Sequence, residues 1–248
     1  MLDIGIDTEL ASDYRICMVD RPVIPTAKQK VEHIEVSGRH GSLTKKGAFE
    51  DVPLKIKFNL LEEENIKPLI RRIKAWFMDG KILYFTDDEV YRKIKSVEIG
   101  DIANEIEEYG EFEVEFTLDP FEYVDTAPIV LTKPENLLNP GTIESAPKLV
   151  IYGGGDVTVT LNDVSFKIKG VAYSVTIDSD LLEAYAGTTS MNSKMIGEFP
   201  LFKPGINTIS WSESVTKIIV EPRWRYKSVT LHYINQMRLI SLIMELAY

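Results

Sequence analysis

The chain has 248 residues, of which 44% are hydrophobic and 27% are charged, a composition typical of a soluble globular protein with one large β domain or two smaller domains. Its formal net charge of −10 argues against an electrostatic nucleic-acid binder, because such proteins need a basic face. The single cysteine, Cys17, excludes an intrachain disulfide and a cysteine-based metal site. We also expect no signal peptide and no membrane insertion, because the start lacks a basic segment followed by an apolar run and no window reaches roughly 18 uninterrupted apolar residues.

Residues 12–40 are predicted to be extended, with a short strand at 31–36. A tight loop follows at 37–43, where two glycines flank Arg39 and His40. Alternating apolar and polar residues then predict a strand over 52–60, because successive side chains on a strand point to opposite faces.

An amphipathic helix is predicted after this strand, with Asn65 as its N-cap and Asp79-Gly80 at its end. Its apolar residues recur at spacings of three and four, and we expect Trp76 to anchor the helix on a sheet. The opposite face is basic and consists of Lys67, Arg71, Arg72 and Lys74.

Further strands are predicted at 81–85, 90–94, 94–99 and 111–118, which makes the first half an α+β unit. The last of these has the clearest alternation, and Asp119-Pro120 ends it because proline has no N–H for the strand ladder. The composition changes after Tyr123. We therefore expect an N-terminal domain at 1–125, a linker at 126–142, a C-terminal domain at 143–226 and an extension at 227–248.

The C-terminal domain is expected to be a sandwich of two packed sheets, because short strands recur every 8–12 residues. Its predicted strands are 148–152, 157–161, 164–168, 171–178, 207–211 and 215–220. For the extension, both a helix and a final strand remain open.

No catalytic, metal or cofactor-binding residue is assigned, because the chain has no phosphate loop, nucleophile elbow or zinc motif. His40 beside Arg39 is interpreted as part of a structural loop, and Asp87-Asp88-Glu89 as a solvated turn and not a calcium site. Glu111, Glu113 and Glu115 lie on one face of a strand. We expect this face to be exposed to water, because like charges so close together repel each other and are best tolerated in solvent. We therefore expect no enzyme and no cofactor.

Several segments follow one another in a distinctive order between residues 21 and 123. They are Arg21-Pro22-Val23-Ile24-Pro25, Gly38-Arg39-His40-Gly41-Ser42-Leu43, Ile73-Lys74-Ala75-Trp76-Phe77, Leu83-Tyr84-Phe85-Thr86-Asp87-Asp88, Val97-Glu98-Ile99-Gly100-Asp101 and Phe112–Tyr123. In order and spacing they resemble the distal tail protein (Dit) family of long-tailed, siphovirus-type phages and prophages. The second half is more loosely similar to that family's galectin-like sandwich, through Asn139-Pro140-Gly141, Pro147, the 207–211 strand and Glu221-Pro222-Arg223-Trp224-Arg225.

The resemblance implies a mainly β fold with some α: an N-terminal α+β or β-sandwich ring domain with one amphipathic helix, and a C-terminal galectin-like β-sandwich. It implies a structural virion protein, made in the host cytoplasm, that forms a hexameric ring, or two rings back to back, at the distal end of the tail. Its implied partners are the tail tube protein, the tail-associated tip protein and receptor-binding or baseplate proteins. The ring extends the channel, so DNA is a partner only in transit.

A ring closes through contacts between two different faces of each subunit. We therefore expect Arg71, Arg72 or Lys74 of one subunit to face a carboxylate among Glu111, Glu113 and Glu115 of the next.

A carbohydrate-binding module for cell-wall glycans is the alternative. Its best candidate contact is Trp211 as an aromatic platform with Glu213 as a polar neighbour. The galectin sugar site depends on a histidine, and residues 126–226 contain none.

Overall fold

A computed structural model describes residues 2–62, 66–100 and 110–227 of the chain. The chain folds into two compact units, one that ends at Glu122 and one that spans Tyr123–Tyr226. Strands dominate both, as expected from the sequence. The boundary between the units falls within β10 (Phe121–Val124), and the last described strand is β22 (Arg225–Lys227).

The N-terminal unit is built on one sheet in which neighbouring strands are antiparallel. The strand order is β2 (Glu9–Leu10), β1 (Ile4–Ile6), β7 (Ile82–Phe85), β8 (Val90–Ile99), β9 (Glu111–Leu118), β6 (Val52–Leu60) and β3 (Ile16–Met18). A 3-10 turn, η1 (Ala11–Tyr14), connects β2 to β3. The strands predicted at 52–60 and 111–118 are confirmed, and they pair along their whole length.

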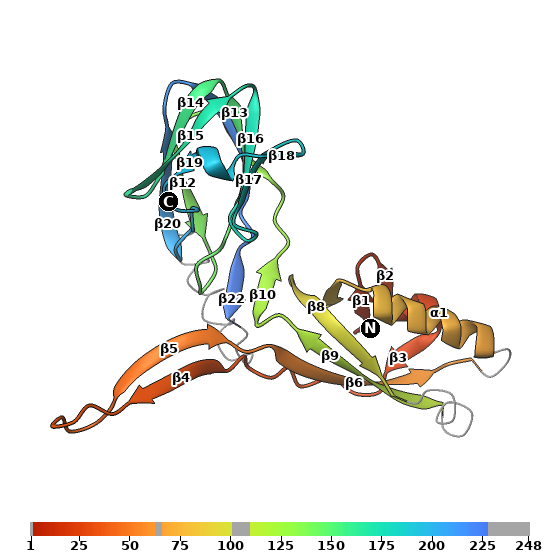
Figure 1. The fold of residues 1–248 in the computed structure, drawn as a ribbon. Coiled ribbons are helices and arrows are strands. Elements are labelled where there is room, and N and C mark those ends of the chain that lie inside the picture. The colour runs from red at the N-terminus through yellow and green to blue at the C-terminus, as the bar shows by residue number, and fades with distance from the viewer. Residues whose placement is uncertain (1, 63–65, 101–109, 228–248) are drawn as a thin grey trace, which may run out of the picture. The chain divides into compact units, whose positions relative to one another are not determined.

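The helix α1 (Ile66–Asp79) covers one face of this sheet (Figure 1). Its Ile73 and Phe77 are completely buried, and the Phe77 ring lies within 6.3 Å of three sheet phenylalanines, Phe58, Phe112 and Phe116. Phe77 is therefore the central anchor of the helix. Trp76, which we expected to anchor the helix, is buried in the same core, with its ring centroid 4.7 Å from those of Phe77 and Tyr14. The predicted N-cap, Asn65, lies outside the described residues.

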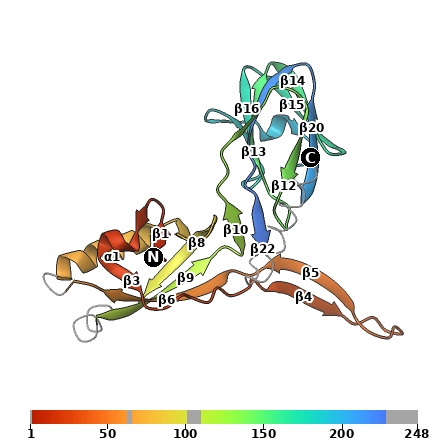
Figure 2. The same cartoon turned by 180° about the vertical axis from the view of Figure 1, so that it is seen from behind.

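A separate hairpin consists of β4 (Gln29–Ile34) and β5 (Leu43–Phe49), which pair with each other and with no other described strand. Figures 1 and 2 show it extending beyond the sheet that carries α1. At its tip, Gly38 and Gly41 have φ angles of 82° and 75°, which confirms the conformational role predicted for these glycines.

The C-terminal unit contains two sheets that enclose one core, to which both contribute. The first has the order β11 (Ile129–Leu131), β21 (Val215–Glu221), β13 (Lys148–Gly153), β16 (Ser174–Asp178), β17 (Glu183–Ala186) and β18 (Thr189–Ser190). The second has the order β12 (Glu135–Asn139), β20 (Gly205–Trp211), β14 (Gly155–Leu161), β15 (Val164–Val171) and β19 (Met195–Ile196). A short 3-10 turn, η2 (Asn192–Lys194), precedes β19.

The linker predicted at 126–142 is wrong, because this segment supplies one strand to each sheet of the C-terminal unit. β11 pairs with β21, and β12 pairs with β20. Leu131 and Leu137 are buried in the core of that unit. Of the extension expected at 227–248, only Lys227 lies within the described residues.

Candidate assembly surfaces

The β4–β5 hairpin exposes apolar side chains on an arm that no other strand among residues 2–62, 66–100 and 110–227 pairs with. Ile34 and Leu43 lie directly opposite each other and are each 40% exposed, and Val31 is 45% exposed. Beside the Ile34–Leu43 pair, Lys45 and Glu32 form a weak exposed ion pair at 3.9 Å. A two-stranded hairpin alone is marginally stable in water, so these side chains gain from being covered by another surface.

The hairpin tip presents Arg39 and His40 in a fully exposed loop. The backbone N–H of Arg39 donates to the Val36 carbonyl at 3.1 Å, which closes a turn, and both flanking glycines stand in open space. The Arg39 side chain has no hydrogen-bond or ion-pair partner among the described residues. The geometry agrees with a structural turn that presents a cation.

The outer face of the sheet carries the three glutamates predicted for a subunit contact. Two of them already have an intrachain partner, because Lys55 Nζ lies 2.9 Å from Glu115 Oε2 and 3.5 Å from Glu113 Oε1. The hydrogen bond and charge of Glu115, followed by those of Glu113, raise the pKa of Lys55 above its usual value. Exposed pairs of this kind contribute little to stability, because water and salt screen them. These pairs therefore do not prevent the glutamates from binding a further cation from a neighbouring subunit. Two of the three glutamates nevertheless already have a lysine partner in their own chain, which we did not expect.

The basic residues of α1 do not all lie on one surface. Arg71 and Lys74 are one turn apart on the outer side of the helix, Arg71 exposed and Lys74 half-buried. Arg72 points to a different side, where its guanidinium carbon lies 5.5 Å from the centroid of the Tyr14 ring. The structure does not bring these cations together with the glutamates within one chain, since the helix covers the inner face of the sheet and the glutamates point outward.

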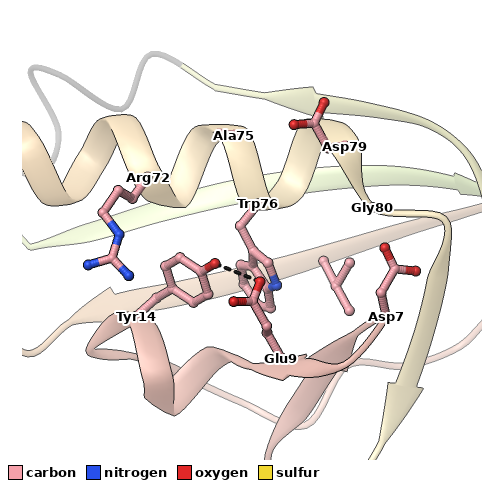
Figure 3. Close-up of a pocket in the computed structure, with 9 residues that line it drawn as sticks. Asp7, Glu9, Tyr14, Arg72, Ala75, Trp76, Asp79 and Gly80 are labelled. Atoms are coloured by element: carbon pink, nitrogen blue, oxygen red, sulfur yellow. Dashed lines mark hydrogen bonds between the residues drawn. The ribbon is translucent and has the colours of Figure 1, made fainter.

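A cavity of about 320 Å³ lies between α1 and the β1–β2–η1 segment (Figure 3). We call it the Trp76 cavity. Its lining residues are Ile6, Asp7, Glu9, Tyr14, Arg72, Ala75, Trp76, Asp79 and Gly80. No sequence motif indicates this cavity, because its walls come from two segments that are distant in the chain.

Aromatic stacking and one hydrogen bond build the floor of the Trp76 cavity. The Tyr14 and Trp76 rings stack with centroids 4.7 Å apart, and the Tyr14 hydroxyl donates to Glu9 Oε2 at 2.8 Å. Burial, followed by the hydrogen bond to Glu9, raises the pKa of Tyr14 to about 12, so this donor keeps its proton at physiological pH. The Trp76 side chain is only 7% exposed, and its indole N–H, whose nitrogen is itself buried, has no acceptor among the described residues. A buried donor without a partner costs about 1–3 kcal/mol, which a ligand offering an acceptor recovers when a shift of the ring uncovers the N–H.

The predicted glycan contact, Trp211 with Glu213, lies at the end of β20 and in the turn that follows it. Trp211 is half-buried and packs against the core of the C-terminal unit, so that part of its ring is covered. Glu213 is exposed in the adjoining turn, where the hydroxyls of Ser212 and Ser214 hydrogen-bond to each other at 2.7 Å.

Within the described ranges, no group of three or more His, Cys, Asp and Glu side chains is placed to hold a metal ion. In the same part of the chain, no helix has the length and apolar character required to cross a membrane.

No protein-family model matches the chain, and no curated protein matches it in sequence. Solved structures do match. The crystal structure of the Dit protein of phage SPP1, described as a paradigm of the hub adsorption apparatus in phages that infect Gram-positive hosts, has a TM-score of 0.64 at 14% identity, over 89% of this chain and 97% of that chain. Two structures of the phage P2 baseplate in its activated conformation, with strontium and with calcium, have TM-scores of 0.46 at 11% identity, over 89% of this chain and 97% of theirs. TM-scores below 0.5 do not establish a shared fold, whereas the match to the SPP1 Dit protein extends over both units. This chain has the fold of the SPP1 Dit protein.

Proposed function

We propose that the chain is a distal tail (Dit) protein, a structural and non-catalytic component of a phage virion whose copies form a hexameric ring at the tail tip. The ring joins the tail tube to the tail-associated tip protein and to the receptor-binding or baseplate proteins. The fold shared with the SPP1 Dit protein over nearly the whole chain supports this assignment.

The β4–β5 hairpin, which pairs with no further strand in the described part of the chain, is the observation that carries the proposal. Its Ile34 and Leu43 are each 40% exposed. A neighbouring copy covers these side chains if each hairpin reaches the next subunit around a ring. Such a contact joins two different faces of the same chain, which is the kind of contact that closes into a ring.

The charge of the chain supports a channel through which DNA passes. A net charge of −10 gives DNA little electrostatic reason to adhere, because phosphate binding depends on lysine and arginine. Sugar binding through Trp211 is not proposed, since the ring of Trp211 is partly committed to the core.

The solution mass of the purified full chain, together with negative-stain images, tests the proposal. We expect a hexamer, or two rings back to back, with an axial hole. A chain that stays monomeric at every concentration would contradict self-assembly. If that monomer also bound cell-wall glycan, and lost the binding on Trp211→Ala, the carbohydrate-binding alternative would replace the proposal.

A further inference from the structure

The side chains that line the Trp76 cavity suit a ligand that has both a positive charge and a hydrogen-bond acceptor. Three of its lining side chains are carboxylates, Asp7, Glu9 and Asp79, and one is a cation, Arg72. The formal charge of the lining is therefore −2. The carboxylates offer acceptors, and the indole N–H of Trp76 is a buried donor without an acceptor among the described residues.

The charges are distributed unevenly along the cavity. Figure 3 shows Arg72 beside the Tyr14 ring, Glu9 below Trp76, and Asp7 at the opposite end from Arg72. Asp7 Oδ1 already accepts from the backbone N–H groups of Lys81 and Ile82, at 3.2 and 3.0 Å, which fixes its position. A cation that enters near Glu9 and Asp7 meets two carboxylates whose positions are fixed by hydrogen bonds. Asp7 is at the end of the cavity opposite Arg72, so repulsion by the Arg72 guanidinium is weakest there.

An arginine at the end of a loop supplies both a cation for the carboxylates and a hydrogen-bond acceptor for the Trp76 indole. Its guanidinium carries five donors for carboxylates and stacks on aromatic rings. The main-chain carbonyls of the loop supply the acceptor that the Trp76 indole needs. The ligand chemistry is therefore a peptide turn that bears an arginine, and a free metal ion does not satisfy it.

The hairpin tip of this chain is such a turn. Arg39 stands at the end of the β4–β5 arm between Gly38 and Gly41, with no ion-pair partner among the described residues. Glycine neighbours leave room for close approach to another surface. The six residues of β4 span about 20 Å at 3.3 Å per residue, enough for the arm to carry its tip onto another molecule.

We propose that the Trp76 cavity receives the Arg39 side chain from the hairpin tip of a second copy of this chain. Glu9 and Asp7 accept from the guanidinium, and docking shifts the Trp76 ring enough to uncover its N–H, which then donates to a main-chain carbonyl of the tip. This inference rests on the proposed ring, and it adds the residues through which one subunit holds the next.

Site-specific cross-linking of the full chain tests the contact. In a Cys17→Ser background, Arg39→Cys is combined with Ala75→Cys, which lies on the exposed helix surface at the cavity wall. A bismaleimide about as long as an arginine side chain should join subunits into a ladder on a denaturing gel. Lys30→Cys with Ala75→Cys is the matched control, because Lys30 lies at the other end of β4 and should not cross-link.

The cross-linking pattern and the oligomer mass together distinguish failure of the Arg39 contact from failure of the proposed ring. An oligomer of normal mass without 39–75 cross-links overturns the Arg39 contact and leaves the ring intact. A chain that forms no oligomer in any variant overturns both.

A double-mutant cycle provides a second measurement. We expect Arg39→Ala to raise the subunit dissociation constant about tenfold, the effect of losing one charge-assisted contact. Glu9→Gln should weaken assembly less once Arg39 is already alanine, because the two share one interaction. Fully additive effects would overturn the pairing.

Discussion

Arg223 donates two hydrogen bonds to the carboxylate of Asp178, from Nη1 to Oδ1 at 2.6 Å and from Nη2 to Oδ2 at 2.8 Å. The pair links the end of β16 to the segment that follows β21. Asp178 Oδ1 also accepts from the backbone N–H groups of Asp180 and Leu181. Burial alone would raise the pKa of Asp178, but the hydrogen bonds and charge of Arg223 outweigh it and hold this pKa below its ordinary value of 3.8.

Asp178→Asn should destabilise the C-terminal unit by about 2 kcal/mol at neutral pH, because it removes a buried carboxylate that holds the half-buried Arg223 through two charge-assisted hydrogen bonds. Hydrogen exchange in the full chain checks this, through faster exchange of the amides of β16 and β21. Asp156→Asn is the matched control. It removes a carboxylate from an exposed pair with Lys167 at 2.9 Å, which contributes little. Equal effects of the two substitutions would contradict the role of the Asp178–Arg223 pair.

The same pair predicts an acid dependence. Since the pKa of Asp178 is lower in the folded chain than in the unfolded one, its contribution to stability is complete above pH 3.8 and is lost as the pH falls through the lowered folded value. The stability difference between the natural chain and Asp178→Asn should therefore shrink as the pH is taken below 3.8. Urea unfolding across a pH series measures it. A difference that stays constant down to the acid end would show that the charge of Asp178 is not what stabilises the unit.

Gly141 is predicted to tolerate no side chain. A Cβ built there would lie 2.2 Å from the backbone carbonyl oxygen of Arg225, and backbone cannot move aside as a flexible side chain can. Its N–H also donates to Asn139 Oδ1 at 2.8 Å. Gly141→Ala should cost about 3 kcal/mol of the stability of the C-terminal unit. Gly154→Ala, where nothing lies within 4 Å, should be nearly neutral in the same thermal unfolding experiment. Comparable losses at both glycines would refute the steric explanation.

The sequence predicted the long strands that bury one face, such as β6 and β9, but only one strand of the exposed hairpin, at 31–36. β6 and β9 alternate because every second side chain enters the core. β5 was missed, since neither face of the hairpin is buried and no alternation is imposed on Leu43–Phe49. β1 and β2 are too short to contain a pattern, and a turn with Asp7 at φ 54° separates them.

Of the candidate assembly surfaces, the sequence could predict only which segments are basic and which are acidic. The sequence indicated the basic helix and the acidic strand, but not that Lys55 lies opposite Glu115 on the neighbouring strand, because strand pairing is long-range. The error at 126–142 has a related cause. Proline and asparagine suggested a linker, whereas the buried Asn139 donates to the Phe202 carbonyl at 3.3 Å and belongs to the folded unit.

Ile34→Lys with Leu43→Lys should prevent ring assembly and leave the fold of the single chain intact. The two side chains are opposite each other on one face of the hairpin, so two lysines there make that face too polar to be covered by a neighbour. Solution mass and far-UV circular dichroism measure the two effects. The control is His33→Lys with Thr44→Lys, the adjacent cross-strand pair on the other face. Assembly that survives the first change, or fails equally with the second, would exclude this face as the contact.

Charge reversal on α1 tests the second predicted contact. Arg71→Glu with Lys74→Glu should weaken assembly, because these side chains lie on the outer side of the helix and would then repel the glutamates of the next subunit. Arg72 is left unchanged, since its place beside Tyr14 makes it part of the Trp76 cavity. The weakening should decrease as salt is raised, because exposed charges are screened. Lys169→Glu with Lys203→Glu changes the net charge equally on exposed positions of the C-terminal unit and serves as the control. If both double variants assemble as the natural chain does, the basic helix takes no part in the ring, and the hairpin alone must hold the subunits together.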